Sequence, residues 1–176
     1  ASSQGTPWLL LTLPIYGTLL IFLFAPLHET IHYTAFKTRW LNNAVAAPIG
    51  FLLLLPFQYF RVFHYAHHRH TQNREHDPEL LDMRPLIRGR YWLYLTGLPT
   101  WWFGFTKLLE HARGRVGESY IEQRHHATIV AEARIHLGGY AVLLLGSLVM
   151  SSAALWWFWI LPALVAQPLD RKSTRL

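Results

Sequence analysis

The stretch WLLLTLPIYGTLLIFLFAPLHETIH, residues 8–32, joins a long apolar run directly to a pair of histidines. Residues 8–27 carry no charge and are long enough to cross about 30 Å of hydrocarbon as a helix. The histidine motif begins where this run stops. The sequence therefore predicts a membrane-spanning helix that places His28 and His32 at one face of a bilayer.

The composition indicates a membrane protein along the rest of the chain as well. Of the 176 residues, 52% are hydrophobic and only 15% are charged. The uncharged run 137–169 is too long for one ordinary span, so we expect two short spans that meet near Met150. Proline and glycine interrupt 44–63 and 91–109, which favours re-entrant or interfacial segments. The predicted fold class is all-α integral membrane, with several transmembrane helices, a re-entrant or interfacial helix and a cytoplasmic histidine-rich cap.

The net charge of +6 does not indicate a nucleic-acid partner, because of where the positive residues lie. Eleven of the sixteen lysines and arginines lie between Arg61 and Arg134, among histidines and acids. Positive charge in short loops marks the cytoplasmic face of a membrane protein. We therefore expect the histidine-rich side to face the cytoplasm, in a bacterial inner membrane or an equivalent membrane. The chain has no cysteine, which excludes disulfides and thiolate metal ligands within it.

Two groups of histidines have helical spacing. His28 and His32 are four residues apart, and His64, His67 and His68 stand at positions i, i+3 and i+4. On a helix these offsets place the side chains on one face. Each group can therefore direct two or three imidazoles at one point, as facing helices do in the metal sites of helical bundles.

The apolar segment 44–63 separates the two groups. A single crossing of the membrane there would leave them on opposite faces, about 30 Å apart. To share one site, the segment must return to the side from which it started. Pro48, Gly50 and Pro56 are positions at which the backbone can break. A shared histidine site therefore predicts a re-entrant hairpin or an interfacial helix at 44–63.

HETIH at 28–32 also matches the HExxH motif of zinc proteases, with Glu29 as the general base. A catalytic zinc takes three protein ligands and keeps one position for water. Intramembrane proteases of this type take an aspartate as the third ligand, but Asp170 lacks the glycine that should follow it. Five imidazoles in two groups suit two metal ions better than one zinc. A zinc intramembrane protease, or a non-catalytic membrane protein that binds metal incidentally, are the alternatives from other classes.

HETIH followed by HYAHH at 64–68, beside membrane spans, resembles the membrane fatty acid desaturase and hydroxylase family. The signature of that family is HxxxH or HxxxxH, then HxxHH, then a late third HxxHH. The continuation HHRHTQNREHDPEL, residues 67–80, is also similar to the family, in which Thr and Asp-Pro follow the second motif. The resemblance covers residues 8–169.

The resemblance implies a non-haem centre of two iron ions with His28, His32, His64, His67 and His68 as ligands, and no catalytic side chain beyond them. Neutral imidazole is a suitable ligand for iron. The implied reaction is O2-dependent desaturation of a fatty-acyl chain, because the metals perform the difficult oxidation of an unactivated methylene. O2 would be a co-substrate, with electrons from an external donor such as ferredoxin or a b-type cytochrome. Hydroxylation or ketolation of a lipid or carotenoid is the alternative within the same family.

Two acids are candidates for supporting the ligands by hydrogen bonds. Asp77 follows the second histidine group and can fix the tautomer of one of its imidazoles. Glu29 lies inside HETIH, where it can support a neighbouring imidazole. For Asp77, a solvated acidic turn before Pro78 is an equally open interpretation.

The third HxxHH of the family does not occur in the chain. In the family it follows the last pair of membrane helices, so we expect this chain to be truncated before it and to be inactive as given. We interpret DRKSTRL, residues 170–176, as a non-native tail, because a common sequencing-adapter read-through translates to these residues. The expected organisation is a membrane desaturase-like domain at 1–169, incomplete at its C-terminal end, followed by this tail.

Overall fold

The computed structural model describes residues 6–81 and 98–164, and this part of the chain is built from helices without strands. The elements are α1 (Thr6–Phe22), α2 (Phe24–Ile31), α3 (Arg39–Leu52), α4 (Phe57–His70), α5 (Pro78–Leu81), α7 (Leu98–Ala112), α8 (Gln123–Val149) and the π-helical turn η1 (Trp156–Ile160). The predicted all-α class is confirmed. The tail expected at 170–176 lies outside the described residues, as do residues 91–97.

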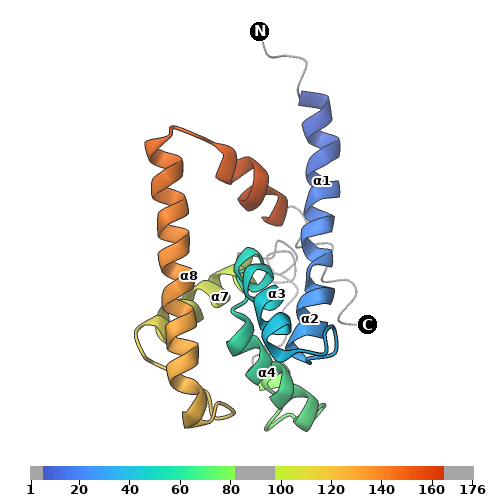
Figure 1. Cartoon of the computed structure of the whole chain (residues 1–176), viewed down its shortest axis with the longest axis vertical. Helices are drawn as coiled ribbons and strands as arrows, with labels where there is room; N and C mark the ends of the chain where they lie inside the picture. Colours follow the sequence, from blue (N-terminus) through green and yellow to red (C-terminus); the bar gives the residue numbers. More distant parts are fainter. Residues whose placement is uncertain (1–5, 82–97, 165–176) are drawn as a thin grey trace, which may run out of the picture.

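Two stretches are long and apolar enough to cross a membrane, Thr12–Ile31 and Gln123–Val149. In Figure 1, α1 and α2 run nearly in line along one side of the molecule, and α8 runs in the opposite direction along the other. Residues 137–149 are the second half of α8, so the first of the two short spans expected within 137–169 is part of one longer helix. After the turn, the described residues 154–164 are helical, and residues 165–169 of the second expected span lie outside the described part of the chain.

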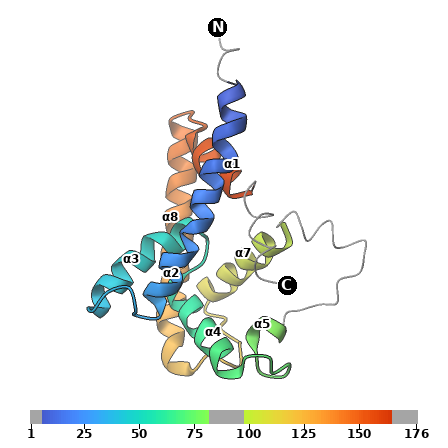
Figure 2. The ribbon, with the colours of Figure 1, turned by 90° about the vertical axis from the view of Figure 1, so that its right-hand side faces the viewer.

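The segment 44–63 bends sharply, as a shared histidine site required, and we call the bent pair of helices that it joins the hairpin. Helices α3 and α4 meet at 99° across a short break, and α4 returns toward α2. Figure 2 shows both arms in the half of the molecule that holds α2, well away from the start of α1. The hairpin therefore brings the second histidine group back to the end of α2.

A tight turn at the end of α3 produces the bend. The N–H of Leu55 donates to the carbonyl of Gly50 at 2.8 Å, and the N–H of Leu54 donates to the carbonyl of Phe51 at 3.3 Å. This pair of bonds defines a Schellman motif, whose penultimate position adopts a left-handed conformation. Leu54 occupies that position with φ of 53°. Pro56 then prevents α3 from continuing.

Gly50 is the residue that lets the two arms approach each other. A Cβ atom at this position would lie 2.6 Å from the carbonyl oxygen of Leu55 and 3.2 Å from the backbone nitrogen of Phe57. Both neighbours are backbone atoms of the bend itself, so neither can move without opening it. The bend consequently depends on the absence of a side chain at this position.

The connection between α7 and α8 is held by a buried ionic cluster. Glu118 accepts hydrogen bonds from Nε2 of His111 at 3.0 Å and from Nζ of Lys107 at 3.2 Å, and Lys107 also pairs with Glu110. Burial alone would raise the pKa of Glu118, but the bonds from His111 and Lys107 outweigh it and lower this pKa to about 2. The cluster fastens the loop that leads to α8 to the end of α7.

Gly50→Ala should lower the free energy of unfolding by about 1–3 kcal/mol, the usual cost of forcing atoms into a filled site. Gly138→Ala is the matched control, because a Cβ there meets nothing within 4 Å and alanine favours a helix interior. Thermal unfolding in detergent measures both. An unfolding temperature for Gly50→Ala equal to that of Gly138→Ala would contradict the role assigned to the bend.

Glu118→Gln should destabilise the protein near neutral pH, with an effect that disappears in acid. Because the pKa of Glu118 is depressed from 4.5 to about 2, its stabilisation is fully present above pH 4.5 and is lost as the pH falls toward about 2. The unfolding temperatures of the wild type and the variant should converge between these values. Parallel curves over this range would show that the carboxylate is not linked to folding.

Candidate metal centre

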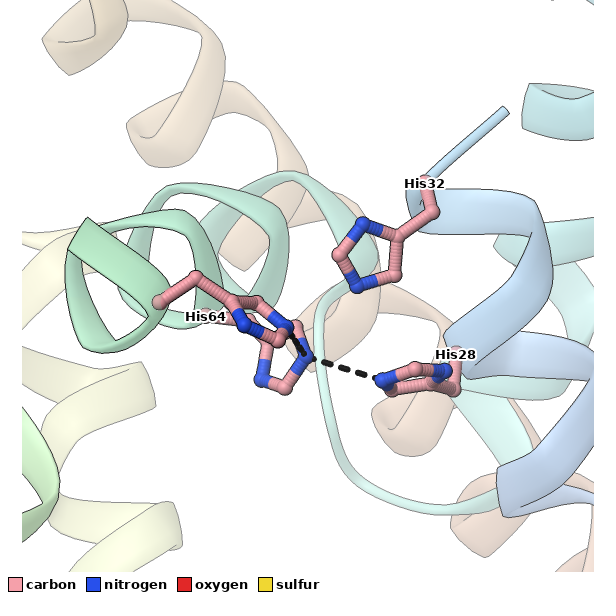
Figure 3. A group of neighbouring side chains, drawn as sticks. His28, His32 and His64 are labelled. Carbon is pink, nitrogen blue, oxygen red and sulfur yellow. Dashed lines mark hydrogen bonds between the residues drawn. The ribbon is translucent and has the colours of Figure 1, made fainter. Parts of the chain in front are cut away.

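Four histidines from two helices converge on one point. They are His28 and His32 at the end of the α1–α2 line, and His64 and His68 on α4. One ring nitrogen of each lies within 4.8 Å of the others. Figure 3 shows the rings of His28, His32 and His64 directed into the space between the two helices. The Nε2 atom of His64 lies 2.9 Å from that of His28 and 2.9 Å from that of His68.

The helical spacing of the sequence produces this convergence. The rings of His28 and His32 are 4.6 Å apart between centroids, and those of His64 and His68 are 4.4 Å apart. Each pair is separated by one helical turn, so both members project from the same face. The two pairs meet because the hairpin returns α4 to α2.

Two side chains of α4 fix its position against α2 by binding the same carbonyl. Ile31 is the last residue of α2, and its carbonyl has no partner within that helix. Arg61 donates to it from Nε at 3.0 Å, and Tyr65 donates from its hydroxyl at 2.9 Å. His64 lies between these two donors on α4, and His32 follows Ile31. The shared acceptor therefore joins the helices at the level of the histidines.

Arg61 also links α4 to α3 and to the turn after α2. Its Nη2 donates to the side chain of Asn43 at 2.8 Å, and its guanidinium carbon lies 4.3 Å from the ring centroid of Tyr33. The arginine is only 8% exposed, so its charge is held by these partners rather than by water. In the sequence, Arg61 is recognisable only as one of the positive charges between residues 61 and 134. Arg61 stands one helical turn before His64, near the start of a largely apolar helix. This position was the signal in the sequence from which a structural role could have been predicted.

His67 lies beside the four-histidine cluster rather than within it. Its Nδ1 is 2.8 Å from Oδ1 of Asp77, and its ring lies 5.7 Å from that of His68 between centroids. A histidine whose Nδ1–H donates to a carboxylate presents its Nε2 to a metal. The structure thus groups four of the five histidines predicted as ligands and gives the fifth a carboxylate partner.

Asp77 is buried beneath the loop that follows α4. It is 1% exposed, and it accepts hydrogen bonds from the backbone N–H groups of Gln72 at 3.1 Å and Glu79 at 2.9 Å, besides its contact with His67. Burial would raise the pKa of Asp77, but the bonds from His67, Glu79 and Gln72 together lower it. The carboxylate is therefore ionised and oriented toward His67. The alternative of a solvated acidic turn does not describe this geometry.

Glu29 lies on the outer side of the cluster. Its Oε1 is 3.3 Å from Nδ1 of His28, and its Oε2 accepts a hydrogen bond from the hydroxyl of Thr34 at 2.7 Å. The opposite nitrogen of His28, Nε2, faces His64. Glu29 is thus placed to orient one imidazole, although its side chain is exposed.

The donor set fits a metal cation. Among the described side chains, Nε2 of His32 and Nδ1 of His64 are buried polar atoms without a hydrogen-bond partner. Burial lowers the pKa of His32, and the nearby His28 and His68 lower it further, which keeps the ring neutral. Neutral imidazole nitrogens at short mutual distances are the ligands that first-row metals prefer.

An apolar cavity of about 380 Å³ adjoins this centre. Phe24 and Phe60 line it and also lie against the cluster, at 6.3 Å from the ring of His28 and 5.3 Å from the ring of His64 respectively. Other parts of its wall come from α1, the hairpin bend and α7. The sequence analysis did not predict this cavity, because its wall combines residues from four separate segments.

Comparisons with known proteins agree with these features. A family model described as fatty acid desaturase matches residues 6–171. The chain is 35% identical over 104 residues to an sn-1 oleoyl-lipid 12-desaturase of Picosynechococcus sp., covering 49% of this chain and 30% of the relative. It is 33% identical over 83 residues to a protein of the same name from Anabaena variabilis, covering 46% of this chain and 24% of the relative.

A third relative is an sn-1 acyl-lipid omega-3 desaturase (ferredoxin) of Nostoc sp.. It is 30% identical over 97 residues, with 49% of this chain and 27% of the relative covered. The matched part of the chain thus spans less than a third of the length of these curated relatives. No solved structure matches the chain.

Arg61→Lys should destabilise the protein more than Tyr65→Phe, although both remove a bond to the carbonyl of Ile31. Lysine cannot reproduce the planar fork that joins Ile31 and Asn43, and hydrogen bonds to charged groups contribute about 1.5–3 kcal/mol, against about 1 kcal/mol for a neutral pair. Thermal unfolding in detergent provides the comparison. Equal losses of unfolding temperature in the two variants would mean that Arg61 acts only through its bond to the carbonyl of Ile31.

Proposed function

This chain belongs to the fatty acid desaturase family, and on that premise we propose that the protein desaturates a fatty-acyl chain at a histidine-ligated centre of two iron ions. The observation that supports this most directly is the convergence of His28, His32, His64 and His68 from two helices far apart in sequence. A zinc protease built on HETIH alone would leave the second pair without a role. Family membership and this pairing both favour the desaturase.

We assign the metal to these four histidines, with His67 as a fifth ligand through its Nε2 atom. When bound, two iron ions would supply the oxidising chemistry that removes one hydrogen from each of two adjacent methylenes, with O2, two external electrons and two protons as the other reactants and two water molecules as the second product. Asp77 and Glu29 hold Nδ1 of His67 and of His28, so that Nε2 of each ring is left for the metal.

The apolar cavity is the proposed site of the acyl chain. Phe24 and Phe60 form the part of its wall that borders the histidines, so a chain bound there passes beside the centre. Apolar walls exclude water from the reacting carbons, and they bind a hydrocarbon by burying its surface. The curated relatives are named for acyl groups carried on lipids, and we propose a membrane lipid as the carrier here too.

The electron donor is proposed from the name of one relative, which includes ferredoxin. A b-type cytochrome is the alternative donor. The donor would approach the end of the molecule that holds the histidines, which we place on the cytoplasmic side because the positive loops lie there. The membrane location itself follows from the two candidate spans and the family.

His64→Ala should weaken iron binding by the purified chain, with a loss of at least about tenfold in affinity for Fe²⁺ under anaerobic conditions. His70→Ala is the matched control, because His70 lies on the same helix but outside the cluster. Iron analysis after desalting measures the difference. One zinc per chain that is lost in His32→Ala but kept in His64→Ala would support the protease instead, and no bound metal would support a non-catalytic protein.

A further inference from the structure

The first turn of α4 is not capped by its own sequence. The helix begins after Pro56, whose side chain makes no capping hydrogen bond. The first backbone N–H groups of any helix have no partner within it. This turn lies at the break of the hairpin, where a membrane protein has little water to satisfy them.

The side chain of Glu132, on helix α8, accepts hydrogen bonds from these N–H groups. Glu132 accepts hydrogen bonds from the N–H of Gln58, at 3.1 Å to Oε1 and 3.0 Å to Oε2, and from the N–H of Tyr59 at 3.2 Å. Glu132 is 7% exposed and lies 74 residues along the chain from Gln58.

The helix that Glu132 caps is the one that carries the second histidine group. His64 lies about two turns beyond the capped N–H groups, and His68 one turn further. Among the described contacts, Glu132 has none with a histidine of the cluster, so any effect on the centre passes through α4. Helix α4 is thus held at its start by α8 and in its middle by the bond from Arg61 to Ile31.

We infer that Glu132 is a positioning residue for the metal centre, which holds His64 and His68 against His28 and His32 by capping α4 from α8. The inference rests on the proposed function, since it requires these four histidines to bind metal. Without the cap, the first turn of α4 loosens in the metal-free protein. Metal binding must then restore that order, and part of the binding free energy is consumed in doing so.

Tyr140 provides a matched control on the same helix. Its hydroxyl donates to the carbonyl of Phe51 at 2.8 Å, at the end of α3. Tyr140→Phe therefore removes a bond from α8 to the other arm of the same bend. Helix α3 carries no histidine, so this loss affects stability without touching the second histidine group.

The test is a Co²⁺ titration of the purified chain in detergent, followed by the visible absorption bands that report metal coordination. Glu132→Gln should weaken Co²⁺ binding by about tenfold, which corresponds to about 1.4 kcal/mol and lies within the usual cost of losing an N-terminal cap. Glu132→Ala should weaken it further, because alanine keeps no acceptor oxygen. Tyr140→Phe should lower the unfolding temperature and leave Co²⁺ affinity within about twofold of the wild type.

Two results would overturn the inference. If Glu132→Gln bound Co²⁺ as tightly as the wild type while unfolding at a lower temperature, Glu132 would be a structural residue only. If the wild type bound Co²⁺ but His64→Ala bound it equally well, the proposed centre itself would fail, and this inference with it. Should Glu132→Gln not fold, Glu132→Asp replaces it, because its carboxyl group is one methylene shorter and should hold the N–H groups of Gln58 and Tyr59 less well. A lower unfolding temperature of Glu132→Asp with unchanged Co²⁺ affinity would then overturn the inference.

Discussion

A helix that breaks inside an apolar layer must find partners for the N–H and C=O groups it exposes, and the structure depends on how this requirement is met. At the end of α3, the carbonyl of Phe51 accepts from Tyr140, and that of Leu52 accepts from the indole of Trp159 at 2.8 Å. At the start of α4, the N–H groups are bound by Glu132. The long helix α8 and the segment after it therefore stabilise a bend that could not persist in lipid by itself.

This bend makes the histidine centre possible. Spacing along each helix only ensures that two imidazoles share a face, and it says nothing of whether the faces meet. They meet because α4 returns to α2, and because the carbonyl of Ile31 binds both Arg61 and Tyr65. The centre thus depends on polar contacts between helices as much as on the histidines themselves. Removing the side chain of Arg61 or of Tyr65 would leave both histidine motifs in the sequence, but α4 would be held less firmly against α2.

The sequence predicted the parts of this arrangement that are local. Helical spacing predicted which histidines share a face. The requirement for a shared site predicted a hairpin or an interfacial helix with possible breaks at Pro48, Gly50 and Pro56, of which Pro48 lies inside α3 and the other two flank the bend. Asp77 was a candidate partner for a histidine, and it contacts His67. The roles of Glu132 and Arg61 could not be predicted, because each depends on a partner brought near only by the fold.

The histidine centre offers imidazole nitrogens from every one of its four converging side chains, with the neighbouring carboxylates turned to the outer nitrogens. Such a donor set follows the Irving–Williams order, in which Fe²⁺ binds less tightly than Cu²⁺ and Zn²⁺. Affinity in this part of the chain therefore does not select iron. A metal bound there would be decided by supply and by the order in which ions reach the folding protein, so the metal content of a purified preparation would depend on the cells that made it.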